Sequence, residues 1–97
     1  MANFMVNISL PTYYHEDLAE LIPDQRVHID KLMSDNIVKG YALSLDRTKL
    51  WTTIAAESED EVVRILHTFP LIDWIKYEII PLMIHLQPVQ VPAISLN

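Results

Sequence analysis

The chain has 97 residues, of which 51% are hydrophobic and 21% are charged, and its net charge is −6. This length allows one domain with one core, and an acidic chain without a cluster of Lys and Arg is not expected to bind nucleic acid. The absence of cysteine excludes disulfides, thiolate catalysis and a cysteine-based zinc site. The N-terminus lacks the basic start and long apolar stretch of a signal peptide, so we expect a cytoplasmic protein.

The N-terminal third of the chain predicts a strand followed by a helix. Apolar and polar side chains alternate over residues 4–10, which indicates a strand, and Pro11 ends it. The helix is predicted from Glu16 to about residue 35, with an apolar stripe that keeps one phase across Pro23. We therefore expect a kink or a one-turn restart at this proline. Asn36 is a candidate for a left-handed cap.

A hairpin is predicted next. Residues 37–45 form a strand in which Gly40, the only glycine, suggests a bulge or a close backbone approach. A polar turn over residues 46–49 leads into a second strand at 50–55, where β-branched and aromatic residues alternate.

The C-terminal part predicts a second helix and a fourth strand. Ser58 and Glu61 have the spacing of a capping box, and Pro70 stops the helix that follows. Residues 77–86 form another apolar run, which is too short to cross a membrane. Pro81 lies inside this run and cannot donate to a ladder, so we expect this strand at a sheet edge.

The order β-α-β-β-α-β is that of an α+β, ferredoxin-like domain, with a four-stranded antiparallel sheet and both helices on one face. The first and third strands are then central. The other sheet face carries apolar side chains that need cover, among them Met5, Ala42, Trp51 and Ala55. Since the chain is small and rich in apolar residues, we expect a homo-oligomer whose smallest unit is a dimer joined sheet to sheet.

The domain is predicted to span residues 1–88, and residues 89–97 form a tail. Pro88 and Pro92 exclude a helix there, and the residues between them alternate in polarity. We expect this tail to lie extended across a neighbouring subunit, with a disordered tail as the alternative.

Several short segments resemble the muconolactone isomerase family. They are Leu10-Pro11, Phe69-Pro70-Leu71, Trp74 and Tyr77-Glu78-Ile79, in that order. The resemblance implies a ferredoxin-like domain that pairs sheet to sheet and often builds larger rings. For the best-known members it also implies a cofactor-independent isomerisation of a small unsaturated lactone.

The chain departs from this family at the positions that carry the chemistry. The resemblance implies a glutamate on the first helix as the proton carrier, and when the chains are matched through Leu32 this position is Gln25. A neutral amide cannot act as a general base. A His-Tyr pair near the hairpin turn is replaced by Arg47 and Thr48. The sequence therefore predicts weak or absent isomerase activity.

Gln25 is nevertheless the first candidate for a binding residue. It lies at the centre of the apolar stripe, where a polar group needs hydrogen-bond partners. Either it points into a ligand pocket between the first helix and the sheet, or it is a structural glutamine bonded to a strand edge or rotated away by the proline. His28, one turn further on, is the candidate replacement base, with Asp24 as another. Tyr41 and Trp51 are candidates for the wall of an aromatic pocket.

Three functions remain open. The first is a lactone or enone isomerase with a shifted base, and the second is a non-catalytic binder of a small apolar acid. The third is a purely oligomeric interaction protein. The four histidines lack metal spacing, and no Gly-rich loop is present to hold a phosphate, so neither a metal nor a nucleotide cofactor is expected.

Overall fold

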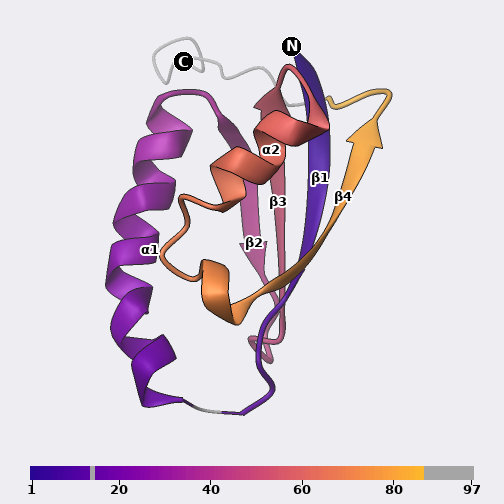
Figure 1. The fold of residues 1–97 in the computed structure, drawn as a ribbon. Coiled ribbons are helices and arrows are strands. Elements are labelled where there is room, and N and C mark those ends of the chain that lie inside the picture. The colour runs from indigo at the N-terminus through magenta and orange to yellow at the C-terminus, as the bar shows by residue number, and fades with distance from the viewer. Residues whose placement is uncertain (14, 87–97) are drawn as a thin grey trace, which may run out of the picture.

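A computed structural model describes residues 1–13 and 15–86 of the chain (Figure 1). The elements in chain order are β1 (Ala2–Ser9), α1 (Glu16–Ser34), β2 (Val38–Leu43), β3 (Lys49–Ala56), α2 (Glu59–Leu66), the short 3₁₀ helix η1 (Ile72–Trp74) and β4 (Lys76–Leu82). This β-α-β-β-α-β order confirms the predicted ferredoxin-like α+β fold. The predicted tail at residues 89–97 lies outside the described residues, and no described helix is long and apolar enough to cross a membrane.

The sheet has the strand order β2-β3-β1-β4, and each neighbouring pair is antiparallel. The first and third strands are therefore central, and β4 is an edge strand, as predicted from Pro81. The pairing of β2 with β3 shifts register between Val38 and Gly40. This irregularity fits a bulge, which was one of the two roles expected of Gly40.

Both helices cover the same face of the sheet, with α1 over β2 and α2 in front of β3 and β1 (Figure 1). The core lies between these layers and is made mostly of aliphatic side chains. Its largest fully buried side chains are Val6, Ile8, Ile29, Thr52, Ile54, Val62 and Leu66. Full burial of one such aliphatic side chain stabilises the fold by about 1.5–3 kcal/mol.

The ends of α1 and α2 show why the helices begin and end there. The Ser58 hydroxyl accepts a hydrogen bond from the Glu61 backbone N–H at 3.2 Å, which caps the start of α2. At the end of α1, Asn36 adopts φ 62°, and the next residue, Ile37, donates its N–H to the Leu32 carbonyl at 2.9 Å. These are the features of a Schellman cap, so the predicted left-handed role of Asn36 is confirmed. Pro23 lies inside α1, which continues through it.

Two strands are shorter than the sequence predicted. β2 ends at Leu43 instead of residue 45, because the Ser44 backbone and hydroxyl already bond to Lys49 and close the turn. β4 ends at Leu82 instead of residue 86. Leu82 pairs with Asn3, near the start of β1, so the later residues have no strand left to pair with.

The sheet face away from the helices is only partly covered. Trp51 and Ile80 are 41% and 42% exposed on this face, while Thr53 and Ala55 are buried by their neighbours. The Asn7 side-chain oxygen is also buried there, without a hydrogen-bond partner among the described residues. A buried polar atom without a partner costs free energy, so this face has a polar as well as an apolar reason to be covered.

Candidate small-molecule pocket

A cavity of about 530 Å³ opens between the N-terminal half of α1 and the end of the sheet where the β2–β3 hairpin turns. Its volume is within the usual range for pockets that hold small molecules. Most of its wall is apolar, from Leu10, Pro11, Leu18, Ala19, Ile22, Leu43, Leu50 and Leu71. Its polar lining residues are Thr12, Tyr13, His15, Gln25, Arg26, Tyr41, Asp46 and Arg47.

The cavity follows from the positions that α1 turns towards the sheet. Two of them, Ala19 and Gln25, lack the branched apolar side chains that would fill the layer. α2 ends at Leu66 and lies over the other end of the sheet. The hairpin end is therefore covered by α1 and by the segment around η1, without a second α-helix (Figure 1).

Gln25 lies in the cavity wall and is only 4% exposed. Its side-chain oxygen accepts a hydrogen bond from the Leu71 backbone N–H at 3.3 Å. Because an N–H can only donate, this contact fixes the amide orientation and turns the Gln25 NH₂ group away from Leu71. The Gln25 amide also lies close enough to the Tyr41 hydroxyl to lower its pKa. Gln25 thus joins α1 to the segment before η1.

Burial raises the pKa of Tyr41 above its ordinary value of 10.0. The hydrogen bond from Gln25 and the positive charge of Arg26 oppose this shift, but they are the smaller causes. Desolvation disfavours the phenolate, so the hydroxyl keeps its proton across the neutral range. Tyr41 therefore presents a neutral hydroxyl in the cavity wall.

The hairpin turn at the cavity is held by Asp46. One carboxylate oxygen accepts three hydrogen bonds, from the Ser44 hydroxyl and from the backbone and hydroxyl of Thr48, at 2.7–3.0 Å. The bond from the Thr48 backbone is the largest cause that lowers the pKa of Asp46, followed by those from the two hydroxyls, and the value falls to about 2. The carboxylate is thus ionised, and its hydrogen bonds hold the turn together.

Arg47 follows directly in this turn with φ 64°, in the left-handed region. Glycine or asparagine adopts this region most easily, and other residues pay roughly 1–2 kcal/mol for it. The Arg47 backbone N–H bonds to the Ser44 carbonyl at 3.0 Å. In the part of the chain that the structure describes, its guanidinium forms neither a hydrogen bond nor an ion pair. Arg26, the other arginine at the cavity, is paired with Asp30 at 3.2 Å.

His15 is the histidine that the structure places in the cavity wall. It is the N-cap of α1, because its Nδ1 accepts a hydrogen bond from the Asp17 N–H at 3.2 Å. The ring also lies 4.5 Å from the Trp74 ring, centroid to centroid. An accepting Nδ1 requires the neutral ring to carry its proton on Nε2. Histidine is not a common N-cap, so sequence patterns carry little signal for this role.

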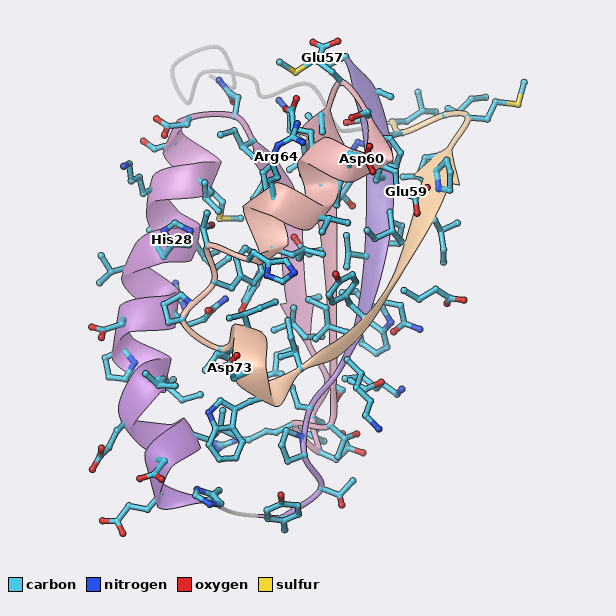
Figure 2. The ribbon with its side chains drawn as sticks, in the orientation of Figure 1. His28, Glu57, Glu59, Asp60, Arg64 and Asp73 are labelled. Atoms are coloured by element: carbon cyan, nitrogen blue, oxygen red, sulfur yellow. The ribbon has the colours of Figure 1, made fainter. Side chains whose placement is uncertain are left out.

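The four site residues predicted from the sequence are not all brought together. Gln25 and Tyr41 both lie in the cavity wall, and the Gln25 amide lowers the pKa of Tyr41. His28 lies outside the lining: its Nε2 is 2.7 Å from the Thr68 hydroxyl, which itself donates to a carbonyl, so His28 donates to Thr68 (Figure 2). Trp51 is on the opposite face of the sheet, between Asn7 and Ala42 in the pairing.

Two arginines and an aspartate at the cavity were not predicted as site residues. Arg26 is an ordinary exposed position on α1, and Asp46 and Arg47 read as a polar turn. The available signal was the Asp-x-Thr spacing, which favours an aspartate that bonds its own turn.

The carboxylates Glu57, Glu59 and Asp60 lie at the start of α2, away from the cavity (Figure 2). Within residues 1–13 and 15–86, no group of three acidic or histidine side chains is placed to hold a metal ion.

No protein-family model matches the chain, and no curated protein matches it. Among solved structures, it is similar to 5-chloro-2-hydroxyhydroquinone dehydrochlorinase (TftG) from Burkholderia phenoliruptrix AC1100 in complex with 2,5-dihydroxybenzoquinone. The match has a TM-score of 0.58 and 17% identity, and it covers 79% of this chain and 89% of the other. This likeness supports the predicted relation to muconolactone isomerase-like proteins at the level of the fold.

Proposed function

We propose that this chain is a muconolactone isomerase-like protein that binds a small, largely apolar ring compound in the cavity between α1 and the sheet. The observation that carries the proposal is a cavity of about 530 Å³ with a mostly apolar wall, in which a hydrogen bond to Leu71 fixes Gln25 and Tyr41 presents a neutral hydroxyl. Apolar pockets with a few fixed polar groups are typical of small-molecule sites. The complex of the structural neighbour with 2,5-dihydroxybenzoquinone adds support, since it shows a small oxygen-substituted ring bound to a protein of similar fold.

The proposed site binds its ligand without moving a proton through Gln25. An amide that accepts from the Leu71 N–H cannot also take a proton from carbon and return it. A cofactor-independent isomerase of a lactone or enone would need another base. His28 stays a prediction for that role, and its bond to Thr68 directs one ring nitrogen away from such work.

Calorimetric titration with 2,5-dihydroxybenzoquinone tests the binding proposal. The variant Ala19→Phe fills the cavity from α1 and should abolish the heat of binding. Glu20→Phe is the matched control, because it adds the same ring to an exposed position on the same helix. Equal binding by Ala19→Phe and the wild type would place the ligand elsewhere and refute this site.

Solvent-deuterium exchange into muconolactone tests the catalytic question. The wild type should exchange no faster than the buffer, whereas Gln25→Glu places a carboxylate at the cavity wall and should give measurable exchange. If the wild type itself exchanges at enzyme-like rates, the non-catalytic proposal fails. Loss of that exchange in His28→Ala would then identify the base.

We also infer that a second copy of the chain covers the open sheet face. Trp51 and Ile80 are large, exposed and apolar there, and the buried Asn7 oxygen lacks a partner among the described residues. Light scattering should show a dimer or larger oligomer for the wild type and a smaller species for Trp51→Glu. Val27→Glu is the control, since Val27 is exposed on α1, away from this face. A well-folded wild-type monomer at dilute concentration would refute the inference.

A further inference from the structure

The cavity has two different polar ends, and they define which ligand it selects. Gln25 and Tyr41 form one end, within the layer between α1 and the sheet. Arg47 forms the other end, on the exposed hairpin turn. Between the two ends the wall is mostly apolar. Ligand selection by these ends rests on the proposed small-molecule function of the cavity.

At the buried end, the hydrogen-bond directions leave one donor for a ligand. The Leu71 N–H donates to the Gln25 oxygen, and the Gln25 amide lowers the pKa of Tyr41, which is the effect of an N–H group directed at the phenol oxygen. The Tyr41 oxygen therefore accepts, and its own hydrogen has no acceptor in this contact. The hydroxyl is neutral because burial disfavours the phenolate. This end consequently offers a hydrogen bond to a carbonyl or hydroxyl oxygen of a ligand.

At the mouth, Arg47 offers a fixed positive charge. Its backbone is held in the turn by the bond to Ser44 and by the three hydrogen bonds to Asp46. Its guanidinium has no ion-pair or hydrogen-bond partner within residues 1–13 and 15–86. The turn would form more easily with glycine or asparagine at this position, so turn formation does not explain the arginine.

The other charges near the mouth do not cancel this arrangement. Asp46 lines the cavity as an anion, but its accepting oxygen already carries three hydrogen bonds within the turn. Arg26 is engaged with Asp30 on the outside of α1. Arg47 is therefore the cation with free donors, and a guanidinium binds carboxylates through paired hydrogen bonds.

We propose that the cavity selects a small apolar ring with an acceptor oxygen at one end and an anionic group at the other. The acceptor oxygen bonds to the Tyr41 hydroxyl at the buried end, and the anion, a carboxylate or an enolate, pairs with Arg47 at the mouth. Gln25 is a positioning residue that holds Tyr41 in its donating direction.

Three inert probes separate the two ends: 4-acetylbenzoate, its methyl ester and 4-ethylbenzoate. The wild type should bind the acid about five to ten times more tightly than the ester, since the carboxylate pairs with an arginine that is partly screened by water. It should also prefer the acetyl to the ethyl compound about fivefold, through one neutral hydrogen bond. Calorimetry gives all three affinities.

Two variants assign these preferences to residues. Arg47→Asn keeps a residue that tolerates the left-handed turn, and it should bind acid and ester within about twofold of each other. Tyr41→Phe keeps the ring and should lose only the acetyl preference. Arg64→Asn is the control, because Arg64 is an exposed cation on α2, away from the cavity (Figure 2), and both preferences should persist. Circular dichroism confirms that each variant is folded.

The outcomes are distinct. An acid preference that survives in Arg47→Asn, or an acetyl preference that survives in Tyr41→Phe, overturns the two-ended assignment while the pocket function stands. Suppose that the wild type binds 2,5-dihydroxybenzoquinone, that Ala19→Phe abolishes this binding, and that none of the three probes binds. The proposed class of ligand, a ring with an acceptor oxygen and an anionic group, is then wrong. If the wild type binds neither set, the proposed function fails as well.

Discussion

The layer between helices and sheet is packed at one end and hollow at the other. At the packed end, Val62 and Leu66 of α2 belong to one core cluster with Ile29 of α1 and Ile54 of β3, and all four are almost completely buried. At the hairpin end, residues of equal apolar character line a cavity, and Leu43 and Ile22 are about half exposed. Both ends use the same sheet and the same first helix, so the difference comes from what α2 covers.

This contrast assigns stability and ligand binding to different parts of one small domain. Buried aliphatic contacts provide most of the favourable free energy of folding, and the buried residues of α2 add theirs only at the packed end. The hairpin end is held in addition by hydrogen bonds, at Gln25 and at Asp46. Such an end can change its lining residues without loss of the fold.

The largest predicted effect compares the same substitution at the two ends. Leu66→Ala leaves a cavity in the packed core and should lower the free energy of unfolding by about 2–5 kcal/mol. Leu43→Ala removes a half-exposed wall residue and should cost less than about 1 kcal/mol. Urea unfolding with unchanged slope measures both values. Equal losses would show that the hairpin end is packed as tightly as the other.

The next effect concerns the buried hydrogen bond between Gln25 and Leu71 at the hollow end. Gln25→Leu keeps the size of the side chain but leaves the Leu71 N–H without its acceptor, which should cost about 1–3 kcal/mol. Hydrogen exchange of the Leu71 amide should become faster in the same variant. Val27→Leu on the exposed side of α1 is the control and should change neither quantity. An unchanged exchange rate would mean that Gln25 does not hold this segment.

Most of the fold can be predicted from the sequence because its signals are local. Pro81, Gly40 and Asn36 each restrict the backbone in one way, and the structure places them at an edge strand, a bulge and a helix cap. The buried position of Gln25 also follows from helical periodicity. The roles of Arg47 and His15 cannot be predicted in this way, because they depend on which side of a turn or of a helix end faces the cavity. Trp51 shows the same limit, because the alternation of a strand does not say which face a ligand uses.

A smaller effect on stability is expected at acidic pH, through Asp46 in the turn at the hollow end. The pKa of Asp46 in the folded state is about 2, below its ordinary value of 3.8, because the Thr48 backbone and two hydroxyls bond to the carboxylate. The ionised form is thus favoured by folding, and this contribution is present above pH 3.8 and lost as the pH falls towards 2. Asp46→Asn should remove that part of the pH dependence of unfolding. A carboxyl titration of Asp46 near 3.8, followed by NMR, would contradict the prediction.

The smallest predicted effect is a gain in the free energy of unfolding when Arg47 is replaced, and it tests whether this arginine serves ligand binding or stability. Its left-handed backbone disfavours arginine, so Arg47→Gly relieves this cost while it adds freedom to the unfolded chain. We expect a net gain of about 0.5–1 kcal/mol in the free energy of unfolding. The same substitution at Arg26, inside α1, should instead lower the free energy of unfolding by about 1 kcal/mol, because glycine is a poor helix former.

Arg47→Gly should also bind 4-acetylbenzoate no better than its methyl ester. A more stable protein that no longer distinguishes acid from ester would show that Arg47 serves the ligand at the expense of the turn. A less stable one would show that the arginine side chain supports the hairpin.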